Sequence, residues 1–137
     1  MSWTFAAGAP TRNRRDSADA HITYGWAPLH TFHGLLAVEE GVELTAMRGF
    51  GGTRSWQDVD TPLRLFFDLQ YVNGDHPISG YRTTADRLQA IYLRWSTTGL
   101  PDDELPSSIK NLQIRLLEGL LSVLDACIAR GERLRIR

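Results

Sequence analysis

The sequence predicts an α+β domain with a small, mostly antiparallel β-sheet in its N-terminal half and two to three helices in its C-terminal half. Three patterns indicate this class. Apolar residues alternate with polar ones in the first half, a helical stripe follows at 83–98, and a long helical run extends from Ser107 to Arg130. Because 137 residues can bury a core without cross-links, we expect a single domain over 1–137.

Two strands are predicted near the N-terminus. Trp3 and Phe5 alternate with polar neighbours, and Ile22, Tyr24 and Trp26 repeat the pattern. The polar stretch between them, residues 11–19, is predicted to be a mobile loop or arm.

A β-hairpin is predicted next, with a turn at Glu39-Glu40-Gly41. The apolar run 32–38 precedes this turn, and alternating Val42, Leu44 and Ala46 follow it. A short helix over 29–36 is the alternative. The stretch Leu63–Val72 alternates like a strand, but Thr61-Pro62 and Asn73-Gly74 bracket it like helix ends, which favours a helix.

A helix is then predicted from Thr83 or Thr84 to Gly99. Its narrow apolar stripe is spaced as on one helix face and consists of Leu88, Ile91, Tyr92 and Trp95. The connection to the last helix is short, so the two should form an antiparallel pair. The alternation of Arg133, Arg135 and Arg137 with apolar residues suits a final edge strand or a basic tail.

The long helix carries the most informative pattern. Ser107 or Ser108 suits its N-cap and Gly131 its C-terminal end. Its apolar residues fill an arc of roughly 200°, about twice what a surface helix needs, so it should be covered on two sides. One cover is the rest of the domain, and the other is a second helix or a second subunit. The residues of a dimer seam would be Leu116, Leu120, Leu124 and Ile128. Gly119, at the edge of the arc, marks either a close backbone approach or a tolerated defect.

Composition limits the class of protein. The formal net charge is −1, which gives no overall field for nucleic acid or membrane. The one cysteine, Cys127, is expected to be a small buried residue, and no secretion signal is recognisable, so we expect a cytoplasmic protein. Lys110 is the single lysine among 15 basic residues, a bias that suggests a GC-rich bacterial or phage source.

The chemistry-bearing residues do not form a known catalytic motif, and no cofactor is expected. His30 and His33 have the spacing of a metal-ligand pair, but no second pair accompanies them. They are therefore only weak candidates for a metal-binding site or a small enzyme.

Two arginine clusters could bind nucleic acid if they share a face. No recognition motif accompanies them, so this is the alternative hypothesis. The clusters are Arg12, Arg14 and Arg15, and Arg133, Arg135 and Arg137.

The preferred hypothesis is a non-enzymatic protein-interaction module, such as an inhibitor, immunity-type or adaptor protein of a bacterium or mobile element. Tryptophan, tyrosine and arginine are frequent anchors of protein interfaces. The candidates in or beside predicted loops are Trp26, Arg54, Trp56 and Tyr81.

Overall fold

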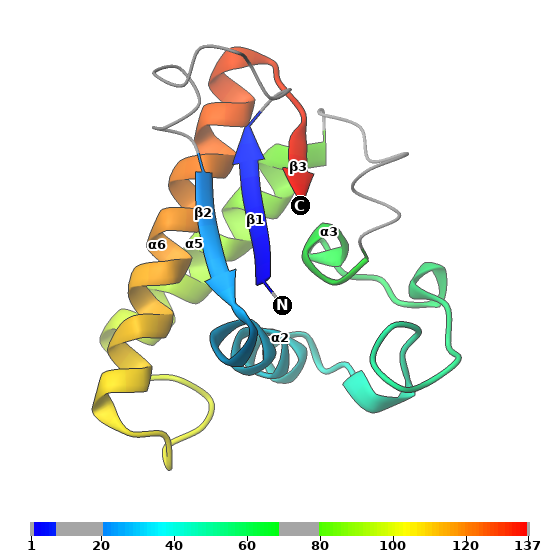
Figure 1. Cartoon of the computed structure of the whole chain (residues 1–137), viewed down its shortest axis with the longest axis vertical. Helices are drawn as coiled ribbons and strands as arrows, with labels where there is room; N and C mark the ends of the chain where they lie inside the picture. Colours follow the sequence, from blue (N-terminus) through cyan, green and yellow to red (C-terminus); the bar gives the residue numbers. More distant parts are fainter. Residues whose placement is uncertain (1, 8–20, 69–79, 137) are drawn as a thin grey trace.

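The computed structural model describes residues 2–7, 21–68 and 80–136. The predicted arm at 11–19 lies outside the described residues. The α+β class is confirmed: a three-stranded antiparallel sheet is combined with several helices, and the last helix is the longest (Figure 1).

The sheet is built from β1 (Ser2–Ala7), β2 (His21–Gly25) and β3 (Leu134–Ile136), in the order β2-β1-β3. Both pairs are antiparallel, and Trp3 opposes Tyr24 while Ala6 opposes Arg135. The two N-terminal strands and the C-terminal edge strand were thus predicted correctly. Trp26 is the exception, because it begins a helix and does not continue the strand.

Helix α6 spans Ser107–Arg130, as predicted. Gly131 adopts a left-handed conformation, and the amides of Gly131 and Glu132 donate to the carbonyls of Ile128 and Cys127, which closes the last turn. The predicted serine N-cap is wrong, because Pro106 occupies the cap position and no side chain caps the helix.

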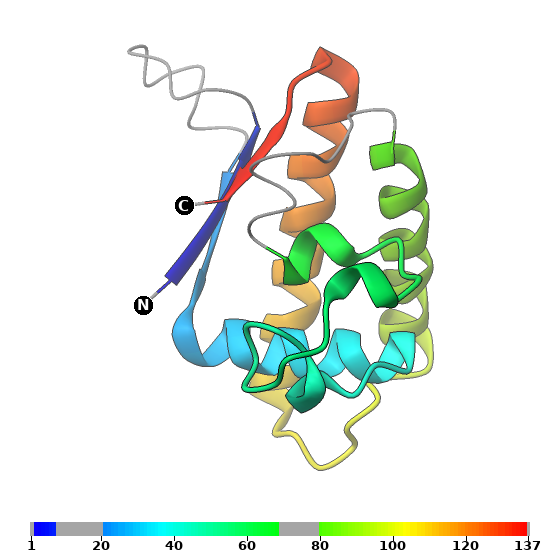
Figure 2. The ribbon, with the colours of Figure 1, turned by 90° about the vertical axis from the view of Figure 1, so that its right-hand side faces the viewer.

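Helix α5 (Tyr81–Thr97) lies antiparallel beside α6, as predicted (Figures 1 and 2). Its buried side includes Leu88, Ile91 and Trp95, while Tyr92 is half-buried against the core. Figure 2 shows the sheet, α6 and α5 as successive layers, so α6 is covered by strands on one side and by a helix on the other.

The predicted hairpin is wrong, because Trp26–Glu40 forms helix α2. The alternative of a short helix over 29–36 was the correct one. A wide arc of α2 is buried, so its apolar residues follow one another almost without interruption and imitate a buried strand. Gly41 (φ 66°) ends the helix where the hairpin turn was expected.

Residues 42–68 contain little regular structure. They include two 3₁₀ turns, η1 (Leu44–Ala46) and η2 (Trp56–Asp58), and the short helix α3 (Arg64–Phe67). The helix predicted over Leu63–Val72 is confirmed at 64–67. Residues 69–72 lie outside the described residues.

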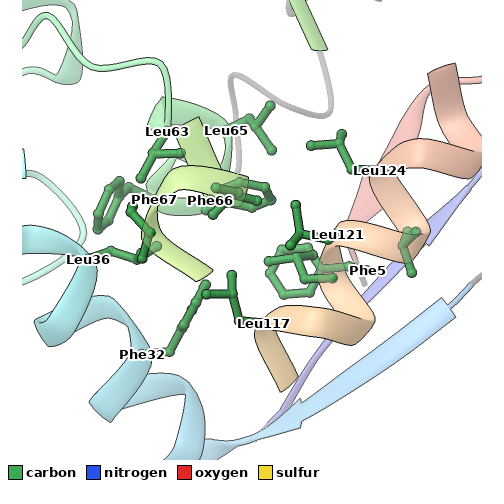
Figure 3. Close-up of a cluster of buried hydrophobic side chains, with 14 of the residues drawn as sticks. Phe5, Phe32, Leu36, Leu63, Leu65, Phe66, Phe67, Leu117, Leu121 and Leu124 are labelled. Atoms are coloured by element: carbon green, nitrogen blue, oxygen red, sulfur yellow. The ribbon is translucent and has the colours of Figure 1, made fainter. Parts of the chain in front are cut away.

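The core forms where α3 meets α2, α6 and β1 (Figure 3). Side chains from all four elements converge there, among them Phe5, Phe32, Leu36, Phe66, Leu117, Leu121 and Leu124. Within the described ranges, no helix is both long and apolar enough to cross a bilayer.

Candidate functional site

The N-terminal end of α2 carries the one exposed tryptophan among the residues that the structure describes. Trp26 opens the helix directly after β2 and is 57% exposed. The His30 ring stacks on the indole, with centroids 6.3 Å apart and planes 28° apart. The backbone beneath is tied to α6, because Gln113 Nε2 donates to the carbonyl of Pro28 over 3.0 Å. The ring therefore stands on a well-anchored turn.

Trp56 and Tyr81, two of the predicted partner-contact residues, are buried. Trp56 is 3% exposed, stacks on Phe67 at 4.7 Å and donates its indole N–H to the carbonyl of Arg48. Tyr81 is fully buried, and its hydroxyl accepts the amide N–H of Leu134. These side chains belong to the core and cannot contact a partner in this fold, so both predictions were wrong.

Arg54, the fourth candidate, is exposed in the loop between η1 and η2. Its Nη2 donates to the carbonyl of Asp58, which holds the side chain along its own loop. Gly52 lets this loop close, because a Cβ there would collide with the backbone of Ala46.

The predicted dimer seam is not an exposed stripe. Leu120 and Leu124 are fully buried in the chain's own core, and Leu116 and Ile128 are half-buried against it. Gly119 faces β2 at a close approach, since a Cβ there would collide with the Cδ1 atom of Ile22. The second cover of α6 is therefore supplied within the chain, and association of two copies through the half-buried Leu116 and Ile128 stays a prediction.

His30 and His33, the weak metal candidates, occupy different environments. His30 is exposed beside Trp26, whereas His33 is 4% exposed and donates from Nε2 to the carbonyl of Phe66 over 2.9 Å. Burial lowers the pKa of His33 to about 4, so the imidazole is neutral at pH 7. Among the described residues, no three His, Cys, Asp or Glu side chains form a group that could hold a metal ion.

Only two of the six arginines proposed to bind nucleic acid lie among the described residues. Arg133 is exposed and Arg135 half-buried, and both follow the end of α6. The other four candidates, Arg12, Arg14, Arg15 and Arg137, lie outside the described residues. Whether the two clusters share a face stays a prediction.

A polar cluster between α2 and α5 was not predicted from the sequence. The Glu39 carboxylate, with its side chain 2% exposed, accepts the indole N–H of Trp95 at 3.1 Å and pairs with Arg94 at 3.3 Å. Arg87 pairs with Glu40 at 3.1 Å. These groups join two helices and leave the buried carboxylate saturated, so the cluster is structural. The adjacent Glu39 and Glu40 indicate such a cluster only when α2 is known to be a helix.

Two buried polar atoms have no hydrogen-bond partner in the part of the chain that is described: Tyr24 Oη and Gln113 Oε1. Burial also raises the pKa of the Tyr24 phenol. Neither atom lies in a group that defines a reaction.

Comparison with known proteins assigns no family. No protein-family model matches the chain, and neither the curated proteins nor the solved structures include a significant match to it. The function must therefore be inferred from the geometry of the chain itself.

Proposed function

We propose that this chain is a non-enzymatic protein-binding module whose contact surface centres on Trp26. The observation that carries the proposal is the exposed indole at the junction of β2 and α2. Tryptophan is enriched among the residues that dominate binding energy at protein interfaces. An inhibitor, immunity-type or adaptor protein would use such a surface. We keep a reducing cytoplasm as the proposed compartment, because Cys127 is a buried free thiol.

The exposed part of the indole is large enough to matter energetically. An aromatic side chain buries about 150–250 Å², and 57% of Trp26 is exposed. At about 25 cal/mol per Å², covering this area fully stabilises a complex by about 2–4 kcal/mol. A loss of about 2 kcal/mol corresponds to a roughly 30-fold weaker Kd.

Leu93 provides a matched control. It lies on α5 and is 54% exposed, nearly the same fraction as Trp26, but it is an aliphatic side chain on another helix. Trp26→Ala and Leu93→Ala therefore both remove exposed apolar area, and neither removes a residue of the core cluster.

The experiment compares wild type, Trp26→Ala and Leu93→Ala as immobilised bait in extract of the native host. Circular dichroism first confirms that all three are folded. We expect at least one protein to bind wild type and Leu93→Ala but not Trp26→Ala. Calorimetry with that purified protein should then show a Kd about 30-fold weaker for Trp26→Ala. If Trp26→Ala retains every protein that wild type retains, the proposal fails; it also fails if Leu93→Ala loses the same ones.

A further inference from the structure

We propose that His33 is an acid-sensitive latch that holds the segment Val42–Asp68 against α2 and β1. This conformational device goes beyond the proposed binding function and does not depend on it. Three observations support it: the segment needs side-chain docking to stay ordered, His33 lies at the docking contact, and its ring is buried there among uncharged aromatic side chains.

The segment cannot hold its structure alone. Its regular elements are three or four residues long, well below the length at which an isolated helix is stable in water. Its order therefore depends on side chains that pack against the rest of the chain. These buried side chains are Met47, Trp56, Leu63, Leu65, Phe66 and Phe67.

His33 contacts this segment at three places and β1 at a fourth. Its Nε2 donates to the carbonyl of Phe66, and its ring lies 5.0 Å from Phe50 and 5.7 Å from Phe67 between centroids. On the other side the ring meets Trp3 edge-on at 5.0 Å. The imidazole thus joins α2, β1 and the segment.

The aromatic rings continue from His33 into the segment. Phe67 stacks on Trp56 at 4.7 Å, and Phe50 meets Trp56 edge-on at 5.9 Å. Displacement of the His33 ring would therefore disturb the packing around Trp56, which provides a fluorescent reporter inside the segment.

The groups around His33 do not compensate a positive charge. Trp3 faces it from β1, Phe50 and Phe67 face it from the segment, and none of these side chains titrates. His30, on the same helix, lowers the pKa of His33 further by its own charge, while the Phe66 carbonyl opposes this only in part. Burial is the largest cause, and the resulting pKa of about 4 compares with 6.5 for an exposed histidine.

Protonation should therefore favour the undocked segment. A ring that binds its proton near pH 6.5 when undocked and near pH 4 when docked makes undocking favourable as the pH falls between these values. Linkage with these two pKa values gives an undocking equilibrium about 20-fold larger at pH 5 than at pH 7. The full effect, well below pH 4 and relative to the fully neutral ring, is about 300-fold.

Undocking removes the side chains of α3 from the core, but the remaining layers keep contacts with one another. Helices α5 and α6 pack on each other, and Glu39 joins α2 to α5 through Trp95 and Arg94. Acid should therefore open residues 42–68 while α5 and α6 stay protected.

The experiment measures amide hydrogen exchange of the intact chain between pH 7 and pH 4, after correction for the intrinsic exchange rate. The variant is His33→Gln, whose amide can donate to the Phe66 carbonyl but cannot ionise in this range. In wild type we expect amides of 42–68 to open about 20-fold more at pH 5 than at pH 7, with those of α6 unchanged. In His33→Gln the increase should fall to threefold or less.

Wild type alone also decides the question should His33→Gln fold poorly. The His33 ring protons, followed by NMR, should titrate together with the opening of the segment. The proposal is overturned if His33 protonates near pH 6.5 while the segment stays protected. It is equally overturned if α6 opens together with the segment, or if His33→Gln keeps the roughly 20-fold response.

Discussion

Gly119 allows a direct test of how closely β2 approaches α6. In an open helix interior, replacing glycine by alanine stabilises by about 0.8–1 kcal/mol. At Gly119 the new Cβ would collide with Ile22 Cδ1, the far end of a flexible side chain. Moving that side chain off its rotamer costs about 0.5–1.5 kcal/mol. We therefore expect Gly119→Ala to change the free energy of unfolding by no more than about 0.7 kcal/mol in either direction.

Removing the colliding atom should let Gly119→Ala raise the free energy of unfolding as it would in an open helix. Ile22→Val deletes Cδ1, and the next atom of Ile22, Cγ1, lies 3.5 Å from the added Cβ, an ordinary contact. The double variant should therefore be about 0.5–1.5 kcal/mol more stable than the sum of the single changes predicts. Gly34→Ala is the matched control, because Gly34 lies in α2 with open space where its Cβ would be, and it should gain about 1 kcal/mol.

The assay is urea unfolding of wild type, Gly119→Ala, Ile22→Val, the double variant and the control Gly34→Ala, with the slope of the free energy of unfolding against urea checked for constancy. The reasoning is refuted if the two changes add within about 0.3 kcal/mol and Gly119→Ala gains as much as Gly34→Ala. Gly119 would then be a tolerated defect, the alternative that the sequence left open.

Three further predictions concern the core and its polar ties. Leu120→Ala should cost about 2–5 kcal/mol in urea unfolding, because the side chain is fully buried, while light scattering gives the same mass as wild type. Tyr81→Phe should cost about 1–3 kcal/mol in the same assay, since it leaves the Leu134 amide without its acceptor; an unchanged midpoint would contradict that hydrogen bond. Glu39→Gln should lower stability by about 1–2 kcal/mol and alter Trp95 fluorescence, because a neutral amide oxygen accepts the indole N–H more weakly and the amide NH₂ cannot accept from Arg94.

The elements that the sequence predicted well are those specified locally. Helix α6 has a long apolar arc and a terminal glycine, and both signals lie within the element itself. The apolar stripe of α5 and the alternation of apolar and polar residues in β1 likewise lie within single elements. Pairing α5 with α6 required only the short connection between them.

Helix α2 was predicted only as the alternative to a hairpin, because its pattern depends on the surrounding layers. A helix buried over a wide arc loses the periodic polar residues that distinguish it from a buried strand. Glu39 and Glu40 then resembled a solvated turn, although their partners Arg87 and Arg94 lie more than 45 residues away in the sequence. Non-local pairing of this kind cannot be inferred from one sequence without the fold.

The candidate site was predictable only in part for the same reason. Trp26 and Trp56 both lay beside predicted loops, and the sequence offered no means of separating them. The fold separates them, because Trp56 stacks on Phe67 in the core whereas Trp26 lies 57% exposed. The burial of a side chain depends on contacts with segments distant in the sequence, so it could not be predicted without the fold.

The position of Trp26 also bears on how a partner would be held. Its backbone passes from β2 directly into α2, and the next turn is tied to α6 through Pro28 and Gln113. A side chain on such an anchored turn loses less conformational freedom on binding than one on a loose loop, so more of its buried area contributes to affinity. Loss of the indole should then act mainly on the dissociation rate, since mutants of one interface differ more in dissociation than in association. A Trp26→Ala complex that associates as fast as wild type but dissociates about 30-fold faster would match this geometry.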